Sequence, residues 1–597
     1  MGLPVIDEES KKRWRRKLDR QQKEAVVLSQ QADDHIERLL IKRFDRLVSV
    51  RKFVILWVGI FALIIFATIL QIRWLAPYYQ RLAPVAGGVY SEGLVGAFTN
   101  SNPLYATGTA DTAVSRLVFS GLFKHDNNNK LVGDLASGYT LDDSQKNYTV
   151  TLRPNVYWQD GKPVTADDVV FTYNIIQNPA ALSPLYNSWR DIKVTKVSAN
   201  KVNFELPNSL SAFPYSLTNG IVPQHLLHKT PPEQLRTAAF NIHPVGSGPF
   251  IWRYVEVSGS TTSDRQQRIS LSANKKYWAG RPKLDGFSII VYPNDQHMIR
   301  AFQKKQINAM SGLELLPEQI AGDKSIYVYN TPLTSAVMAF FNNSHDGLGD
   351  VNLRKALVSG IDRKEIESLS KYPVRLTNEP LLRDQLGFDP SVPELPFNKA
   401  YAEQLLDQAG WKLGAGGIRY KDGKPLQFEM ASQDDQQYAK LATLLQDMWA
   451  KVGVKINTHY YSNDDLQGQI IATHDYDILL YGISLGVDPD QFAYWDSSQA
   501  NLGSQGHLNL SEYKSSAADQ ALEAGRTRSD AAVRIVKYKA FLNAWSNDAP
   551  AVTLYQPNFL YITRGPVYGY ERKASNSGTD RFYNIRDWAI RQKRQTL

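Results

Sequence analysis

An uncharged apolar run of twenty residues, FVILWVGIFALIIFATILQI from Phe53 to Ile72, constrains this chain more than any other feature. At about 1.5 Å per residue, a helix of this length matches a hydrocarbon core about 30 Å thick. A tail of about 50 residues precedes the run, and the run is longer than the apolar core of a signal peptide. The sequence therefore predicts one uncleaved transmembrane helix over 53–72.

Basic residues are distributed unevenly around this run. Fourteen Lys and Arg precede it, whereas only Arg73 and Arg81 follow it closely. The positive-inside rule then places residues 1–52 in the cytoplasm and everything after about residue 75 on the extracytoplasmic side. We expect a single-pass protein of the cell membrane, with residues 73–85 as a linker.

The cytoplasmic tail is predicted to be an amphipathic helix. From Glu8 to Val50 it contains no Gly or Pro, and Ile36, Leu40, Phe44 and Leu47 recur at helical spacing among charged residues. Contact with a lipid surface or with a cytoplasmic partner is one interpretation. A solvated helix that only fixes the orientation of the span is the simpler one.

Charge and cysteine content exclude several functions for the remainder of the chain. The net charge of +9 divides into +7 for residues 1–81 (16 Lys and Arg, 9 Asp and Glu) and +2 for residues 82–597 (52 against 50). Such a balance offers no electrostatic channel for a nucleic acid. The absence of Cys excludes disulfides, thiolate metal sites and cysteine nucleophiles. We predict no metal and no cofactor.

Residues 85–597 have the alternating pattern of an α/β fold. Tyr148–Leu152 and Ser288–Tyr292 have the composition of strands, whereas Asp350–Ile361 and Asn398–Ala409 have the periodicity of amphipathic helices. Thr165 followed by Asp168 predicts a helix cap. No second apolar run reaches the length of a membrane span, so this region is expected to be soluble.

One motif is typical of hydrolases. Gly482, Ser484 and Gly486 form G-x-S-x-G after the strand-like Tyr476–Tyr481, as in a nucleophile elbow. An elbow continues directly into a helix, but here Pro489 biases the preceding residue away from helical geometry. Only His507 follows as a candidate base. We therefore interpret the motif as a turn lining a cleft, with a serine hydrolase as a minor alternative.

Two further motifs have ordinary structural interpretations. His225 and His228 have a spacing that can place two imidazoles on one helix face, but no third ligand lies near them in sequence. Gly246 and Gly248 flank Ser247 without the Lys or helix start of a phosphate-binding loop. We interpret the histidines as incidental and the glycines as a turn.

The stretch YTVTLRPNVYWQDGKPVTADDVVFTY, Tyr148–Tyr173, combines a strand, Leu-Arg-Pro, an aromatic pair, Asp-Gly-x-Pro and Thr-Ala-x-Asp-Val. With it the chain strongly resembles the family-5 extracellular solute-binding proteins, the oligopeptide- and dipeptide-binding receptors of ABC importers. Further matching stretches follow in the family's order: Pro244–Phe250, Asn274–Gly286, Val351–Arg363, Ala402–Trp411 and Tyr476–Trp495.

The resemblance implies a two-lobed, class II periplasmic-binding-protein-like α/β fold, preceded by the transmembrane helix. Two chain crossings, near Thr334–Asn342 and Pro550–Tyr555, would join the lobes. Lobe one would comprise residues 86–335 and 554–597, with an inserted subdomain over about 125–240, and lobe two would comprise residues 336–553.

The resemblance also implies that two loops hold the main chain of a ligand in the cleft. Related receptors commonly carry an Asp that binds the free amine of a peptide, at the position that Leu485 occupies here. Peptides are the leading ligand class, while sugar, siderophore-like, opine-like and blocked-peptide ligands stay open. The matching loop residues are Thr107, Gly108, Thr109 and Ala110 with Asp111 beside them, and Tyr481, Gly482, Ile483, Ser484 and Leu485.

We therefore predict a membrane-tethered extracytoplasmic receptor that delivers peptides or peptide-like solutes to the permease subunits of an ABC importer, without catalysis of its own. The alternative is a ligand sensor or assembly protein that signals inward through its cytoplasmic tail.

Overall fold

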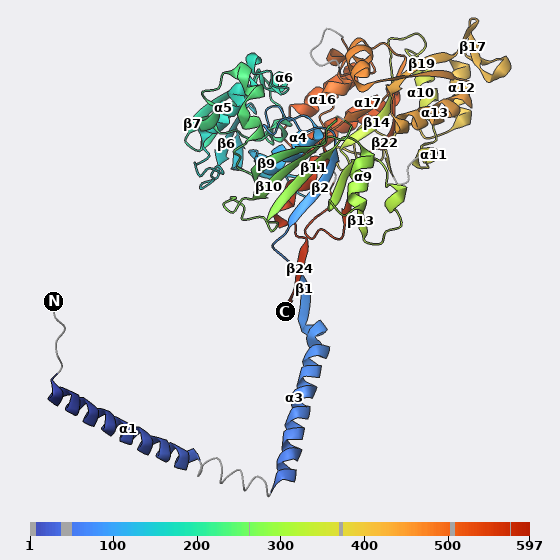
Figure 1. Ribbon diagram of the computed structural model, residues 1–597. Helices are drawn as coiled ribbons and strands as arrows, with labels where there is room; N and C mark the ends of the chain where they lie inside the picture. Colours follow the sequence, from blue (N-terminus) through green and yellow to red (C-terminus); the bar gives the residue numbers. More distant parts are fainter. Residues whose placement is uncertain are drawn as a thin grey trace. The chain divides into compact units, whose positions relative to one another are not determined.

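The computed structural model describes residues 7–36, 50–261, 263–368, 374–501, 508–573 and 575–596 (Figure 1). The chain forms two compact units. One contains residues 1–83 and 592–597, and the other runs from Pro84 to Arg591.

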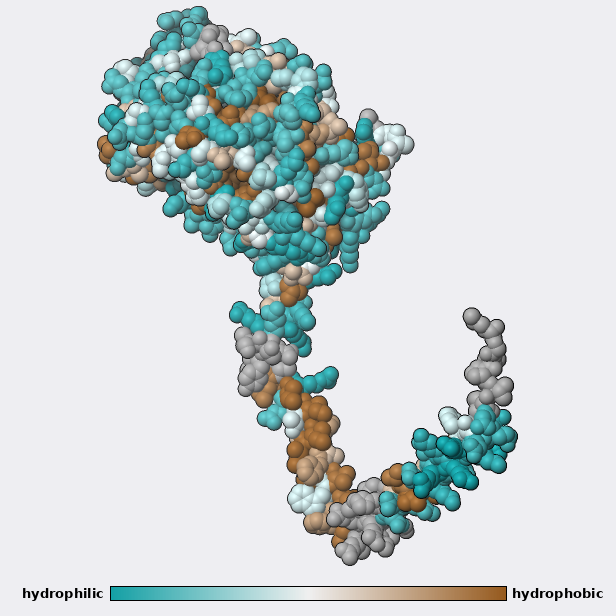
Figure 2. Space-filling view, turned by 90° about the vertical axis from the view of Figure 1, so that its left-hand side faces the viewer, coloured by the Kyte–Doolittle hydropathy of each residue, from teal (hydrophilic) through white to brown (hydrophobic). Residues whose placement is uncertain are grey.

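The first unit contains two long helices. The tail helix α1 (Glu8–Ile36) lies where the sequence predicts it, whereas the predicted positions Leu40, Phe44 and Leu47 lie outside the described residues. Helix α3 (Arg51–Tyr79) contains the predicted span. Within the described part of the chain, its residues 51–75 form the one helix long and apolar enough to cross a membrane. Figure 2 shows that the surface of α3 is largely hydrophobic and that the surface of α1 is mostly hydrophilic.

The predicted linker, residues 73–85, contains the end of one helix and one strand. Helix α3 continues to Tyr79, and β1 (Gln80–Val85) follows it directly. Strand β1 pairs with β24 (Arg591–Thr596), from the opposite end of the chain. The partner strand lies at the opposite end of the chain, so no pattern local to residues 73–85 records this pairing.

The second unit is built on two large sheets, which define lobe one and lobe two. In lobe one, β2 is parallel to both of its neighbours, and the other pairs are antiparallel. Every residue of β11 is buried, as expected for a strand covered on both faces. The order is β13 (Ile326–Pro332), β23 (Asn558–Arg564), β12 (Ala309–Leu313), β2 (Val89–Val95), β11 (Gly286–Tyr292), β10 (Gln266–Ala273) and β9 (Phe250–Ser258).

A four-stranded antiparallel sheet is inserted into lobe one and carries the most specific part of the family resemblance. Its order is β5 (Ala136–Leu141), β6 (Asn147–Leu152), β8 (Lys201–Glu205) and β7 (Lys193–Ser198). Helix α5 (Ala166–Ile176) packs against it and begins with the predicted cap. The Thr165 backbone N–H donates to Asp168 Oδ2 at 2.9 Å, so these two residues form a capping box.

Lobe two is also a mixed α/β layer structure. Its sheet has the order β15 (Arg375–Leu376), β22 (Ala551–Gln556), β14 (Ser335–Phe341), β21 (Ile478–Ser484), β19 (Gln427–Gln433) and β20 (Lys455–Tyr461). Two predicted helices are confirmed as α10 (Val351–Ser359) and α12 (Lys399–Gln408), capped by Asp350 and Asn398. The remaining long helices of this lobe are α13 (Gln436–Ala450), α16 (Ser516–Arg526) and α17 (Ala531–Asp548).

The chain passes between the lobes at residues 333–334 and at Pro557, next to the stretches named from the resemblance. Those stretches, near Thr334–Asn342 and Pro550–Tyr555, mainly form β14 and β22, which pair within lobe two. The sheet of lobe two accordingly runs from Ser335 to Gln556. Both stretches are largely apolar, so the sequence pattern does not mark where a strand leaves its sheet. Leu333 N–H donates to Pro557 O at 2.8 Å, which places the two crossings side by side.

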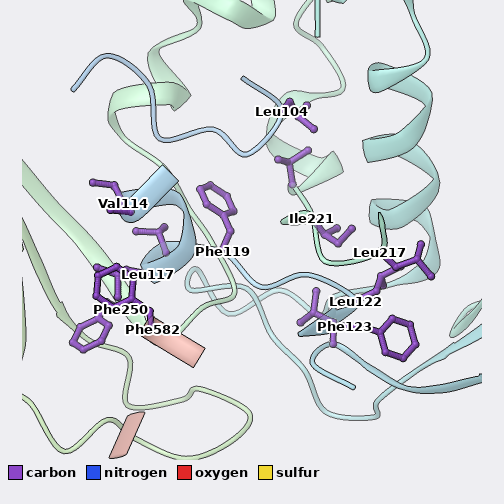
Figure 3. Close-up of a cluster of buried hydrophobic side chains, with 14 of the residues drawn as sticks. Leu104, Val114, Leu117, Phe119, Leu122, Phe123, Leu217, Ile221, Phe250 and Phe582 are labelled. Atoms are coloured by element: carbon purple, nitrogen blue, oxygen red, sulfur yellow. The ribbon is translucent and has the colours of Figure 1, made fainter. Parts of the chain in front are cut away.

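Helix α4 (Thr109–Val118) is held by the core of lobe one. Figure 3 shows Val114 and Leu117 near Phe250 and Phe582, and all four side chains are buried. Burying an apolar side chain of this size stabilises a fold by about 1.5–3 kcal/mol. The anchoring fixes α4, and with it the predicted ligand loop at its N-terminus.

Glu379 in lobe two is a buried acid that forms no ion pair with any residue in the described part of the chain. It is 1% exposed, its Oε1 accepts no hydrogen bond, and its Oε2 accepts one long bond from Asp389 N at 3.4 Å. Burial raises its pKa from 4.5 to about 8, and the charges of Asp389 and Glu394 add to the rise. The folded chain therefore keeps this proton between pH 4.5 and 8, where the unfolded chain releases it.

Stability should consequently fall as pH rises through this window and level off above about pH 8. Glu379→Gln supplies a neutral group of the same shape and should remove the loss. As the pH rises from 5 to 9, the free energy of unfolding of the variant should increase by a few kcal/mol relative to that of the wild type. One pKa unit corresponds to about 1.4 kcal/mol. Thermal unfolding of both proteins across this range tests the prediction, and parallel profiles would refute it.

Candidate functional site

The first predicted segment, Thr107–Asp111, forms the N-terminus of α4. Thr107, Gly108 and Thr109 are exposed, and the helix begins at Thr109, after Gly108, which provides no side-chain cap. Uncapped N–H groups and the helix dipole make such a terminus favourable for a carbonyl or carboxylate oxygen. Ala110 is buried and packs in the core. This segment can therefore offer backbone donors to a ligand.

Asp111 has a structural task beside this terminus. Its Oδ1 accepts hydrogen bonds from Thr99 N at 2.7 Å and Asn100 N at 3.1 Å, and its Oδ2 accepts one from Thr99 Oγ1 at 2.7 Å. The side chain is buried. The carboxylate thus holds the loop between β2 and α4, and its lone pairs are largely occupied.

The second predicted segment, Tyr481–Leu485, is the end of β21 and the first residue after it. Ser484 is exposed, and its carbonyl accepts a hydrogen bond from Tyr494 OH at 2.8 Å. Gly482 lies against Tyr438, since a Cβ atom at this position would be 2.7 Å from the Tyr438 hydroxyl. Tyr481 is half-buried. Backbone and tyrosine hydroxyls therefore dominate this edge.

The side chains of Ile483 and Leu485 lie on the opposite face from Ser484. Both belong to an apolar core cluster of lobe two, and Leu485 is only 5% exposed. The position to which the resemblance assigns an anchoring Asp is thus occupied by a core side chain. A carboxylate there would need a polar partner to offset its desolvation.

A chain of contacts through the crossings links the two predicted segments. In α4, Arg116 forms an ion pair with Asp580 at 3.7 Å, and Asp580 accepts a hydrogen bond from Asn576 N at 2.8 Å. Asn576 in turn accepts from the Thr334 hydroxyl. The carbonyl of Thr334 then accepts from Leu485 N at 2.9 Å and Gly486 N at 3.1 Å. Helix α4 and the end of β21 are therefore mechanically connected across the lobe boundary.

Tyrosines and carboxylates that the sequence did not single out gather at the same boundary. A cavity of about 60 Å³ is lined by Glu314 from lobe one and by Tyr555 and Gln436 from lobe two. Burial raises the pKa of Tyr555 to about 12, with a contribution from the carboxylates of Glu314 and Asp435. Burial likewise raises the pKa of Tyr494 to about 12. At neutral pH these hydroxyls are uncharged and can both donate and accept hydrogen bonds.

The carboxyl of Glu314 responds to the same surroundings. Partial desolvation raises its pKa, and the nearby charges of Asp435 and Asp295 raise it further, although part of the side chain stays exposed. The neighbouring Asp435 has a position that is typical of functional sites. Asp435 stands between strand β19 and helix α13, at the carboxyl end of a parallel strand, where sites of α/β proteins commonly lie.

A groove of about 350 Å³ separates the inserted subdomain from lobe two. Its lining combines polar residues such as Asn208 and Arg526 with apolar ones such as Leu210 and Phe492. The Arg526 guanidinium lies 4.0 Å over the Phe492 ring, and its Nε is 3.3 Å from Asp490 Oδ2. Ser211 N–H and Oγ–H both donate to the Arg526 carbonyl, at 2.9 and 3.0 Å. The inserted subdomain therefore touches lobe two directly.

Asp488, the other acid near the second segment, is paired internally. Its carboxylate binds both terminal nitrogens of Arg534, at 2.6 and 2.9 Å, and both side chains are buried. Asp111 and Asp488 are the carboxylates closest in sequence to the predicted loops. Both are bound by other groups of the protein, so neither is free for a ligand amine.

A cavity of about 660 Å³ in lobe one lies apart from both predicted segments. Charged residues of both signs line it, including Arg116, Lys124, Asp134 and Arg586, together with Trp278. None of the ten predicted site residues is in its wall.

The geometry around Ser484 differs from that of a nucleophile elbow. Strand β21 continues through Ser484, and the next helix, α15 (Phe492–Trp495), begins eight residues later. An elbow needs the helix directly after the serine. The candidate base His507 lies outside the described residues.

The two histidines considered as metal ligands have separate partners. His225 Nε2 lies 2.6 Å from Asp160 Oδ2, and His228 Nδ1 lies 3.1 Å from the Gln224 carbonyl. Within the described ranges, no three His, Asp or Glu side chains are grouped so as to hold a metal ion.

Comparison with known proteins identifies the family. Residues 130–504, more than half of the chain, match the family described as bacterial extracellular solute-binding proteins, family 5 Middle. The chain belongs to this family. Its members are binding proteins, so membership confirms the predicted α/β fold and the prediction that the chain is not an enzyme.

Individual relatives cover most of this chain. The oligopeptide-binding protein AppA of Bacillus subtilis is 28% identical over 515 residues, which are 85% of this chain and 92% of AppA. The structure of AppA in complex with a nonapeptide has a TM-score of 0.66 at 26% identity and covers 85% of this chain and 100% of that one. NikZ of Campylobacter jejuni in complex with Ni(L-His) has a TM-score of 0.68 at 26% identity, covering 84% and 99%.

Proposed function

We propose that this protein is a membrane-tethered receptor that captures peptides or peptide-like solutes between its lobes and delivers them to the permease subunits of an ABC importer. The observation that carries the proposal is the side-by-side pair of crossings at residues 333–334 and Pro557. Two adjacent crossings allow the lobes to close about a ligand as a hinge. The family and the nonapeptide complex of AppA support the ligand class.

The chemistry of the boundary suits main-chain recognition. Lobe one offers the uncapped N-terminus of α4, and lobe two offers the edge of β21 with its neutral tyrosines. Hydrogen bonds to the main chain of an extended ligand do not depend on its side chains. A receptor built this way can accept many sequences. Closure would remove water from the ligand and present a distinct loaded form to the importer.

We predict that an N-acetylated peptide binds at least as tightly as the same peptide with a free amine. Leu485 lies in the core, and the carboxylates of Asp111 and Asp488 are engaged by the protein itself. An ammonium buried without a carboxylate would cost several kcal/mol. Calorimetric titration of both peptides against the wild type gives the ratio of affinities.

A free-amine preference of tenfold or more, about 1.4 kcal/mol, would contradict this prediction. The boundary carboxylates would then be the substitute anchors, and Glu314→Gln and Asp435→Asn would abolish the preference. Asp167→Asn, which changes an exposed carboxylate of the inserted subdomain, serves as the matched control.

The membrane topology is part of the proposal. Fourteen basic residues before the apolar helix and two shortly after it support a cytoplasmic N-terminus. A protease added outside intact cells should digest the region after residue 75 and spare a tag at the N-terminus. Digestion of the tag would reverse the orientation, and release of a soluble form cleaved after the span would refute the anchor.

A further inference from the structure

Helix α1 carries a concentrated basic segment with one aromatic residue at its centre. Six of the seven residues from Lys11 to Lys17 are Lys or Arg, and the seventh is Trp14. Trp14 is 73% exposed, and every residue from Asp7 to Asp34 is exposed. An exposed tryptophan among basic side chains is typical of helices that lie on a lipid surface.

Trp14 and three of the other apolar residues of α1 form a stripe along one face. Leu18, Ala25 and Leu28 follow Trp14 at intervals of four, seven and three residues, which keeps them on the same side of a helix. Leu28 is 66% exposed. Lys11 and Lys17 lie three residues before and after Trp14, about 60° to either side of it. Basic side chains therefore flank the stripe, while Val26 and Val27 lie off it.

The position of α1 in the chain limits how far it can move from the candidate span. Residues 37–50, fourteen residues, separate the end of α1 from the start of α3. A fully extended chain of this length reaches about 50 Å. If α3 spans the membrane, α1 stays within that distance of the cytoplasmic leaflet, and its effective concentration at the surface is high.

We propose that α1 lies on the cytoplasmic leaflet and binds anionic lipids. Lys11–Lys17 contact the headgroups, and the stripe from Trp14 to Leu28 enters the interface. Trp favours the interface, and the long stems of Lys and Arg allow their charges to reach the headgroups while the helix lies flat. The positive segment complements the negative cytoplasmic surface. This inference rests on the topology in the proposed function.

The absence of Cys permits a test on the full chain, because one introduced cysteine can be labelled uniquely. Leu28→Cys places an environment-sensitive fluorophore on the stripe, and Gln30→Cys, about 200° around the helix, is the matched control. Each labelled protein is reconstituted in phosphatidylcholine bilayers with or without phosphatidylglycerol. Carbonate extraction verifies insertion of α3.

In anionic bilayers the label at position 28 should shift its emission to the blue and be quenched by brominated acyl chains, while the label at 30 stays in water. Replacing the six basic residues of Lys11–Lys17 by glutamine should reduce the bound fraction at least tenfold. High salt should weaken binding, because at 1 M the Debye length falls to about 3 Å.

The outcomes separate this inference from the topology on which it rests. Failure of α3 to insert would overturn both. An inserted protein whose position-28 label stays in water in anionic bilayers would overturn the lipid contact alone. Burial of that label only when importer subunits are added, independent of lipid charge, would also overturn it and identify a protein partner instead.

Discussion

Replacing Glu92 by glutamine is expected to lower the free energy of unfolding of the region 84–591 by about 3–5 kcal/mol. Glu92 is fully buried in the sheet of lobe one and forms an ion pair with Arg581, whose side chain is 3% exposed. Its carboxylate also accepts hydrogen bonds from Ser311 Oγ at 2.9 Å and Tyr561 OH at 3.1 Å. The amide of glutamine would leave the guanidinium of Arg581 buried without a counter-charge.

Urea unfolding followed by tryptophan fluorescence measures this loss. An exposed ion pair provides the control, since Lys196 and Asp167 are each more than 40% exposed and Asp167→Asn should cost less than about 1 kcal/mol. Glu92→Met combined with Arg581→Met should be less destabilising than Glu92→Gln, because no unpaired charge is left behind. Equal unfolding midpoints for Glu92→Gln and the wild type would show that the pair contributes nothing.

Asp488→Ala should have an effect of similar size on lobe two, about 3–5 kcal/mol, and should also weaken solute binding at least tenfold. Asp488 and Arg534 are each 8% exposed. Burial alone lowers the pKa of Arg534, but the hydrogen bonds and charge of Asp488 outweigh it and raise the pKa. The pair fastens the loop after β21 to α17, so its loss should release the second ligand segment.

Asp384→Ala is the matched control for this variant. Asp384 also pairs with an arginine, Arg375, but both side chains are exposed, so stability and binding should change little. Thermal unfolding and peptide titration of the two variants distinguish the loss of a buried ion pair from the loss of an exposed one. A binding-competent Asp488→Ala protein with wild-type stability would contradict the structural role of the pair.

Features fixed by neighbouring residues were predictable from the sequence. The capping box of Thr165 and Asp168 and the cap at Asn398 each join residues three positions apart. The apolar run from Phe53 to Ile72 was also predictable, because all of it lies within one helix. In each case the interaction lies within a single turn or a single helix, which a sequence pattern records directly.

Features fixed by distant partners were not predictable. Arg534 lies 46 residues from Asp488 and determines that this acid is not free for a ligand. Leu485 has a position in the family pattern, but only the packing of lobe two shows that its side chain lies in the core. Glu314 and Tyr555 meet at one cavity although they come from different lobes. No local pattern carries such pairings, because the tertiary fold creates them.

The central claim, peptide capture between the lobes, is tested most directly by native mass spectrometry of the full chain after incubation with a pool of peptides of graded length. The account predicts that intact peptides stay bound and are released on activation. Gly482→Trp, which would displace Tyr438 from the edge of β21, should lose them while remaining folded. A folded wild-type chain that retains no peptide of any length would contradict the account.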